Sequence, residues 1–283
     1  MKRKNSLVGI VILAIAALIG TARKFQPADA TDGATPTAVS QRTTSADEVS
    51  AADATPKASA QLRTLSVPRY ESPRGGQVIK RTGYTLSYDA DYKTPQWVGW
   101  TLTAEQAQGG VPREDDFQPD PDVKGAKAYT TDYKNSGYDR GHICPAGDMK
   151  WSLTAMRESF YLSNICPQNR NLNRGDWKEL EELEREWAIT RGSVCITAGP
   201  IYEKKRPARI GANKVAVPDA FFKVVLVDYP KKPKAYAFVF RNAAGNHPLT
   251  YYQLSVNELE RRTGMDFFPG LSEKVEDAVP ALP

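Results

Sequence analysis

The chain has 283 residues, of which 41% are hydrophobic and 10% aromatic, and this composition is that of a globular protein rather than a disordered or fibrous one. Its formal net charge is +5, partly from Lys2, Arg3 and Lys4 at the N-terminus. This modest basic excess favours a polyanionic partner but does not by itself separate nucleic-acid-binding proteins from other classes.

Residues 1–22 are predicted to be a signal peptide or an N-terminal anchor. Three basic residues precede an almost unbroken apolar run from Leu7 to Ile19. The run is shorter than the roughly 20 apolar residues of a comfortable membrane span, which favours cleavage and export to the periplasm or the medium. Retention as a membrane anchor through residues 7–19 is the alternative. No cysteine lies near the run, which argues against a lipoprotein.

The rest of the chain divides by composition into three segments. Residues 23–61 are rich in Ala, Thr, Ser, Asp and Pro, cannot bury enough apolar surface to offset their chain entropy, and are predicted to be a disordered linker. Apolar content resumes at Leu62, and no second break follows before the Pro-rich end, so residues 62–278 are predicted to form one domain and 279–283 a tail. No internal repeat is visible.

Strand patterns dominate the predicted domain. Alternating segments at 83–88 and 96–102, separated by a turn, predict a β-hairpin. Further strands are predicted by the apolar segments 160–165, 194–198, 222–227 and 235–240. With one clear helix among them, this order predicts an α+β protein with a central antiparallel sheet flanked by helices.

The clearest helix is predicted at 177–190. Its inward stripe consists of Trp177, Leu180, Leu183 and Trp187. At about 100° per residue, Asn173 projects onto this apolar side if the helix already includes it, and Glu181 falls at the edge of the stripe. Gly175 leaves that start open, and Asn173 as a helix N-cap is the alternative.

The chain contains only two histidines, His142 and His247. Histidine titrates nearest neutrality, so His142, in the string Asp139-Arg140-Gly141-His142, is the preferred candidate for a group that activates water. His247 lies in Asn246-His247-Pro248, which predicts a turn.

Together these residues suit phosphodiester hydrolysis, which requires an activated water and neutralisation of charge on the phosphate and on the leaving oxygen. His142 would take the proton of the water. Asn173 offers a neutral oxygen ligand for a hard divalent cation such as magnesium, and Glu181 would hold the waters of that cation.

These motifs resemble those of the DNA/RNA non-specific endonuclease family, which includes secreted bacterial nucleases and mitochondrial endonuclease G. The resemblance lies in Asp139–His142, in Ser163–Gln168 and in Asn173 followed by Trp177 and Glu181. It implies a ββα-metal core, also called a His-Me finger, in which a strand carries the histidine and a following helix carries the asparagine ligand. It also implies magnesium-dependent cleavage of DNA and RNA to 5′-phosphate products, with manganese as a substitute metal.

The resemblance covers roughly residues 84–240 and implies a role for each matching position. It implies that His142 is the general base, that Asn173 is the metal ligand and that Glu181 binds the metal through water. Arg140 would contact the phosphate, and Asn164 would support the base or substrate. Arg113, on a less secure match, would be a second phosphate contact.

Alternatives remain at the level of residues and of function. His142 would otherwise be a satisfied core histidine, Arg140 an ordinary ion-pair partner and Glu181 a solvated helix carboxylate. The same metal site would also serve a phosphodiesterase acting on small or lipid phosphates, and a nucleic-acid-binding module without turnover is a further alternative.

Three cysteines cannot all pair with one another, and no metal-binding cysteine spacing is present. Cys144 and Cys166 each follow a candidate site residue by two positions, which predicts neighbouring strands, and Cys195 lies in a predicted strand. The three cysteines are expected to be small buried residues, and a single disulfide bond between two of them is the alternative.

Two basic loops, 204–209 and 231–234, are predicted to be solvated turns rather than binding patches. No interface signature is visible, so the oligomeric state is left open, with a homodimer as one outcome.

Overall fold

The computed structural model describes residues 56–283. The segment 1–22, predicted as a signal or anchor, and most of the predicted linker at 23–61 lie outside the described residues. Among residues 56–283, no helix combines the length and the apolar character needed to cross a membrane.

The strands, in chain order, are β1 (Gln77–Lys80), β2 (Tyr84–Asp89), β3 (Thr94–Thr103), β4 (Asp139–His142), β5 (Ile165–Gln168), β6 (Ser193–Ile201), β7 (Arg209–Ile210), β8 (Val215–Ala216), β9 (Ala220–Val227), β10 (Lys234–Arg241) and β11 (Gln253–Leu254). The α-helices are α1 (Pro56–Leu65), α2 (Ala104–Ala107), α3 (Thr130–Tyr133), α4 (Leu153–Ser159), α5 (Arg170–Arg174), α6 (Asp176–Arg191), α7 (Val256–Thr263) and α8 (Glu273–Glu276). Three 3-10 turns complete the described elements: η1 (Ala146–Met149), η2 (Leu162–Asn164) and η3 (Leu249–Tyr252).

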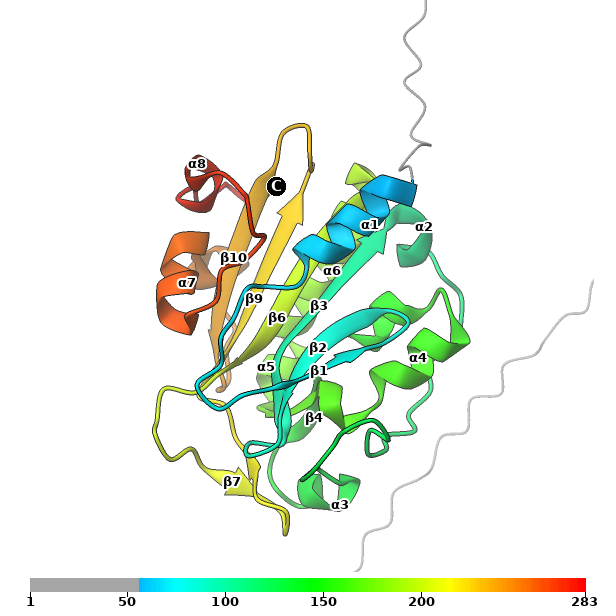
Figure 1. The fold of residues 1–283 in the computed structure, drawn as a ribbon, viewed down its shortest axis with the longest axis vertical. Helices are drawn as coiled ribbons and strands as arrows, with labels where there is room; N and C mark the ends of the chain where they lie inside the picture. Colours follow the sequence, from blue (N-terminus) through cyan, green and yellow to red (C-terminus); the bar gives the residue numbers. More distant parts are fainter. Residues whose placement is uncertain (1–55) are drawn as a thin grey trace, which may run out of the picture. The chain divides into compact units, whose positions relative to one another are not determined.

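A seven-stranded antiparallel sheet in the order β1-β2-β3-β6-β9-β10-β11 forms the centre of the described residues (Figure 1). This arrangement confirms the predicted α+β class with helices flanking an antiparallel sheet. The hairpin predicted at 83–88 and 96–102 is β2 and β3, and the segments predicted at 194–198, 222–227 and 235–240 lie in β6, β9 and β10.

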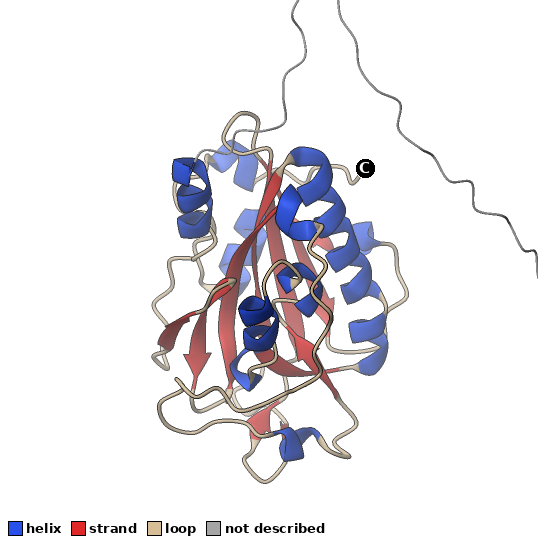
Figure 2. Ribbon diagram, turned by 90° about the vertical axis from the view of Figure 1, so that its right-hand side faces the viewer, coloured by secondary structure: helices blue, strands red, loops and turns tan. Residues whose placement is uncertain are grey.

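Helices cover both faces of the sheet, as the two perpendicular views show (Figures 1 and 2). One face packs against α6 and the segment carrying β4 and β5, and the other packs against α1, α7 and the chain that follows α7. Strand β9 shows the effect of this double coverage on the sequence. Phe221 and Val225 point to the first core, and Phe222 and Val224 point to the second. Because both faces are buried, nearly every residue of the strand is apolar.

A small ladder carries the motif residues outside the main sheet. Strands β4 and β5 pair antiparallel, with Gly141 opposite Cys166 and His142 opposite Ile165, and helix α5 follows β5 directly. This is the expected ββα unit, with the histidine on a strand and Asn173 on the helix.

One local prediction was wrong, and the position of Asn173, which the sequence left open, differs from both alternatives. The strand predicted at 160–165 is a helix end and a 3-10 turn, with only Ile165 in β5, because Phe160 and Leu162 bury their side chains through tertiary contacts and not by strand pairing. Asn173 does not belong to the long helix. Gly175 separates α5 from α6, and the N-cap of α5 is Asn169, whose side chain accepts from two backbone amides.

The folded part of the chain extends beyond the predicted limits of the domain, residues 62 and 278, at both ends. Helix α1 starts at Pro56, inside the predicted linker, and its Leu62 is buried in the second core. At the other end, Leu282 of the predicted tail packs on the first core, and Gln253 Nε2 donates to the carbonyl of Pro280 at 2.7 Å. Both segments owe their order to docking on the sheet, which composition does not reveal.

Candidate active site

His142 is the last residue of β4, and its imidazole lies in an aromatic cage. Only 8% of the residue is exposed, and its ring centroid lies 5.2 Å from that of Phe117 and 4.9 Å from that of Phe160. Burial, reinforced by the positive charges of Arg113 and Arg140, lowers the pKa of His142 to about 3. The imidazole is therefore neutral at ordinary pH and able to accept a proton.

Each ring of the cage carries an arginine. The guanidinium carbon of Arg140 lies 4.1 Å from the centroid of Phe117, and that of Arg113 lies 5.1 Å from the centroid of Phe160. Arg113, the least secure match in the sequence, is thus brought beside His142 by its loop. Two exposed cations next to a neutral base suit an anionic substrate such as a phosphodiester.

Arg113, Arg140 and Phe117 line a groove with a volume of about 680 Å³. Its lining includes three of the six predicted site residues, Arg113, Arg140 and Asn173. His142 adjoins the groove wall through Phe117, whereas Glu181 and Asn164 do not line it.

Asp139 orients Asn173. Its carboxylate accepts from Asn173 Nδ2 at 3.2 Å, from Arg174 Nε at 2.9 Å and from Arg170 Nε at 3.4 Å. Burial raises the pKa of Asp139, but the hydrogen bonds from Arg174 and Asn173 outweigh this effect and the net pKa is lowered. This role was not predicted, because the contact depends on how α5 folds back on β4.

The amide of Asn173 fits a hard-cation ligand. With Nδ2 held by Asp139, the Oδ1 atom accepts no hydrogen bond from residues 56–283, so a neutral oxygen is left free at the groove. Within the same range no cluster of three or more His, Cys, Asp or Glu residues could hold a metal.

Glu181 lies half-buried on α6, the helix that packs against α5. Burial, with a smaller contribution from Asp148, raises its pKa to about 7, while Lys223 and Arg185 oppose the rise. Glu181 is therefore not a fully solvated surface carboxylate.

Asn164 braces the loop after His142. Its Oδ1 accepts from the backbone amide of Cys144, and its Nδ2 donates to the carbonyls of Cys144 and Ser159, each at 2.9 Å. The side chain is fully buried and both amide hydrogens are engaged. Through these bonds it braces the backbone beside His142, which fits the predicted support of the base.

Gln168 and Gly141 show why the motif contains a glycine. A Cβ added at Gly141 would lie 2.1 Å from Gln168 Oε1 and 2.6 Å from Gln168 Cβ, so any larger residue here would force the Gln168 side chain to shift. Among the described residues, neither polar atom of the buried Gln168 amide has a hydrogen-bond partner.

A buried polar network behind the site was also missed. Lys223 of β9 is completely buried, pairs with Glu184 at 3.1 Å and lies 4.2 Å from the ring centroid of Trp177. Burial raises the pKa of Glu184 to about 8. Asp148, also buried, accepts from Trp100 Nε1 at 2.9 Å. Because α6 and β9 show a clear hydrophobic pattern, the sequence did not indicate that Glu184 and Lys223 point inward.

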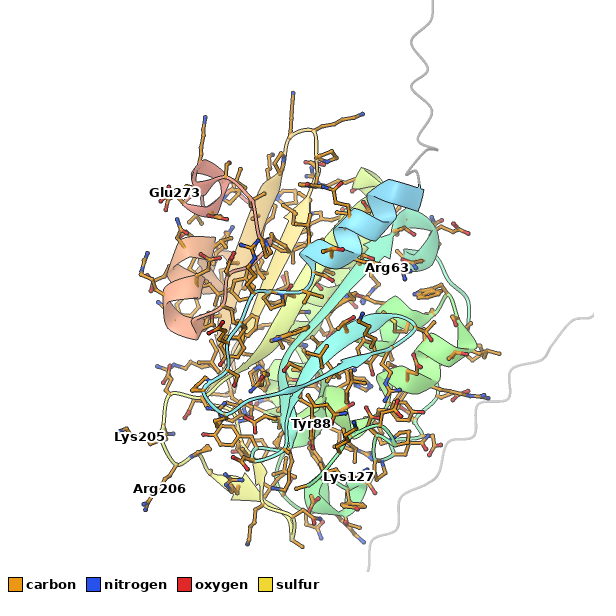
Figure 3. The ribbon with its side chains drawn as sticks, viewed as in Figure 1. Arg63, Tyr88, Lys127, Lys205, Arg206 and Glu273 are labelled. Atoms are coloured by element: carbon orange, nitrogen blue, oxygen red, sulfur yellow. The ribbon has the colours of Figure 1, made fainter. Side chains whose placement is uncertain are left out.

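The other predicted features lie around this site. Cys144, Cys166 and Cys195 are all buried and free, so the disulfide left open by the sequence is not formed. Lys205 and Arg206 project from the exposed loop before β7 (Figure 3), at the same end of the molecule as α3, which lines the groove.

Comparisons with known proteins agree with this geometry. A family model described as DNA/RNA non-specific endonuclease matches residues 63–274. Mitochondrial nuclease EXOG of Danio rerio is 38% identical over 225 residues, covering 74% of this chain and 66% of that protein. Mitochondrial endonuclease G of Homo sapiens is 33% identical over 217 residues, covering 72% of this chain and 73% of that protein.

A solved structure, described as the EndoG/EndoGI complex and the mechanism of EndoG inhibition, matches with a TM-score of 0.70 and 31% identity over 76% of this chain and 93% of that one. The chain spans slightly less than two thirds of the EXOG proteins of Danio rerio and Xenopus laevis, 66% and 60% respectively. Since the family model covers most of the described residues and these relatives share a third or more of the aligned positions, the chain belongs to the DNA/RNA non-specific endonuclease family.

Proposed function

We propose that the protein is a metal-dependent endonuclease that hydrolyses phosphodiester bonds of DNA and RNA and leaves 5′-phosphate products. The observation that carries the proposal is the neutral, caged His142 flanked by Arg113 and Arg140 at the edge of a groove that contains Asn173. Membership of the family, whose members are metal-dependent, supports the same activity.

His142 accepts the proton of the attacking water. The imidazole is neutral at ordinary pH, as a proton acceptor must be, and the cage of Phe117 and Phe160 fixes the direction of its ring. Arg140 and Arg113 hold the phosphate and offset the charge that develops on it.

Asn173, together with waters held by Glu181, would bind the metal ion. A bound magnesium or manganese ion supplies Lewis-acid stabilisation of the phosphate and of the leaving oxygen. Asp139 keeps the Oδ1 atom of Asn173 free for that purpose through its hydrogen bond to Nδ2.

Recognition through phosphates predicts little sequence preference. The groove offers Arg113, Arg140, Arg174 and Lys134 to a backbone, and such contacts do not distinguish one base from another. Both DNA and RNA therefore fit.

The test uses the purified full chain with plasmid DNA, RNA and a small phosphodiester, each with magnesium or with chelator. We expect plasmid and RNA to be cleaved only with metal, and His142→Ala and Asn173→Ala each to lose at least about 100-fold in rate. Lys231→Ala, in the exposed turn between β9 and β10, is the matched control and should keep full activity.

Other outcomes select the alternatives. Binding of nucleic acid without cleavage by the parent would favour an inactive binding module, and cleavage of the small diester alone would favour a phosphodiesterase of small or lipid phosphates. Undiminished cleavage by His142→Ala would remove the general-base role.

Export, with residues 1–22 as the signal or anchor, is also proposed. It rests on the basic and apolar pattern of that segment, whereas the relatives described above carry mitochondrial names. The mass of the mature N-terminus decides between cleavage and anchoring. The EndoG of the solved complex has an inhibitor partner, and the groove of this chain is the proposed surface for any comparable inhibitor.

A further inference from the structure

Two stacked rings, those of His247 and Tyr251, stand exposed in the segment between β10 and β11. Their centroids are 4.2 Å apart and their planes differ by 26°. Tyr251 is 67% exposed, more than any other large hydrophobic residue in the described part of the chain. Two exposed rings stacked in this way present a flat aromatic surface to solvent.

The segment is attached to the residue that begins α5. The side chain of Asn242 accepts from the backbone amide of Asn169, the N-cap of α5, at 2.7 Å. The same side chain donates to the carbonyl of Pro167 in β5 at 3.0 Å. One end of the segment is therefore fixed at the start of the helix that carries Asn173.

The other end is attached to the first residue of α6. Asp176 accepts from the backbone amide of Asn246 at 2.7 Å and from the hydroxyl of Tyr252. A Cβ added at Gly245 would lie 2.0 Å from Asp176 Oδ2, so the contact is close. Because α5 lies between Asn169 and Asp176, the segment spans the short helix that bears the proposed metal ligand.

The rings are held in place before any ligand arrives. Asn246 adopts a φ of 94°, which a non-glycine residue holds only when its surroundings impose it. The buried Tyr252 packs edge-on against Tyr251, with centroids 5.2 Å apart and planes at 90°. Tyr251 is thus supported by Tyr252 and His247 and open to solvent elsewhere.

We propose that His247 and Tyr251 form a stacking platform for an unpaired nucleobase of the substrate strand near the scissile phosphate. Stacking on an aromatic ring accepts every base, as a nuclease without sequence preference requires, but it needs a base that is not paired. Arg170 and Arg174 of the adjoining α5 are exposed and share the single carboxylate of Asp139, so the pair keeps a net positive charge for the backbone of the same strand. The platform makes the enzyme favour single-stranded or locally opened substrate, an inference that rests on the proposed nuclease function.

The test measures binding of a fluorescent single-stranded DNA oligonucleotide and of a blunt DNA duplex to the full chain by anisotropy, in the presence of EDTA. We expect Tyr251→Ala to weaken binding of the single strand by roughly 5- to 100-fold and binding of the duplex much less. Tyr251→Phe keeps the ring and should restore binding to the parent value, while His247→Ala should weaken it in the same direction as Tyr251→Ala. Ile189→Ala, an exposed apolar position near the end of α6, is the control and should bind as the parent does.

Equal affinity of Tyr251→Ala and the parent for the single strand would overturn the platform. Light scattering tests whether the rings contact a second copy of the chain instead of a nucleobase. A change from dimer to monomer in Tyr251→Ala would assign the rings to a contact between copies and would also overturn the proposal. Metal-dependent cleavage by the parent is measured separately, so failure of the nuclease function and failure of the platform give different results.

Discussion

The chemistry of His142 is set by its neighbours rather than by the residue itself. Aromatic rings remove water from the imidazole, and Arg113 and Arg140 disfavour a third positive charge. Both effects act in the same direction, so the neutral form persists well below the usual titration range of histidine.

This environment predicts a pH-dependent stability. The folded pKa of His142 is about 3 and the unfolded pKa is about 6.5, so between these values the unfolded chain binds the additional proton. The contribution of His142 is complete above the unfolded pKa and is lost as the pH falls, by about 2 kcal/mol between pH 7 and pH 5.

Urea unfolding at both pH values checks this prediction, with His142→Phe as the comparison because it fills the cage without titrating. Between pH 7 and pH 5, the free energy of unfolding of the parent should fall by about 2 kcal/mol more than that of the variant. Equal losses would show that the imidazole is not kept neutral by folding.

Asp139 acts at the residue scale through Asn173. Asp139→Ala removes the acceptor that fixes the amide, so we expect the magnesium concentration for half-maximal cleavage to rise by about 10- to 100-fold. A metal titration of plasmid cleavage measures this effect. Asp122→Ala, at a carboxylate that is 63% exposed and paired with Arg81, is the control, and an unchanged metal requirement in Asp139→Ala would contradict the orienting role.

At the scale of elements, the β4–β5 ladder decides where His142 points. Gly141 faces Cys166 across the ladder and packs on the side chain of Gln168 of the same neighbouring strand. Because Gly141 has no side chain, the side chain of Gln168 can pack directly against the backbone of β4 beside His142.

Gly141→Ala is therefore expected to destabilise the fold by about 1–3 kcal/mol, because the new methyl group overlaps the Gln168 side chain. Thermal or urea unfolding measures the loss. In a double-mutant cycle with Gln168→Gly, which removes the overlapping atoms, the double variant should be less destabilised than the sum of the single variants. Strict additivity would place the cost elsewhere.

The helix α6 supports the site from behind with two kinds of contact. Trp177, Leu180 and Trp187 bury the apolar stripe that the sequence predicts, and Glu184 on the same inward side pairs with Lys223 of β9. A buried charge of either sign is tolerated only because its partner is present on the facing element.

At the scale of the molecule, the candidate site is assembled from distant segments. Arg113 and Phe117 come from the loop after α2, His142 from β4, Phe160 from the end of α4 and Asn173 from α5. The groove is lined by four basic side chains, Arg113, Lys134, Arg140 and Arg174, and by two acidic ones, Asp115 and Asp139, so its lining is positively charged overall.

Salt should therefore weaken nucleic-acid binding. We expect the affinity for duplex DNA, measured with EDTA, to fall by roughly 10- to 100-fold between about 50 and 200 mM salt, since phosphate contacts release counterions. Arg113→Ala should reduce the slope of log affinity against log salt by about 1. Lys231→Ala, in the turn between β9 and β10 at the end opposite α3 (Figure 1), should leave the slope unchanged, and an unchanged slope in Arg113→Ala would remove that residue from the phosphate contacts.

Strong local patterns in the sequence predicted much of this fold. The alternation in β2 and β3, the apolar runs of β6, β9 and β10, and the stripe of α6 all correspond to elements of the structure, because burial on a sheet or helix face leaves a period in the sequence. The segment 160–165 lacked such a period: its apolar residues are buried by neighbours distant in sequence, and the prediction failed there.

The α+β class, the family and the candidate residues His142, Arg140, Asn173 and Glu181 follow from residue types at fixed spacing, so they can be predicted without a structure. The proximity of Arg113 to His142, the bracing role of the buried Asn164, the orientation of Asn173 by Asp139 and the two exposed rings beside α5 became visible only in the folded chain. Burial, charge proximity and hydrogen-bond direction depend on contacts between segments far apart in the chain, and no local pattern of residues encodes these contacts.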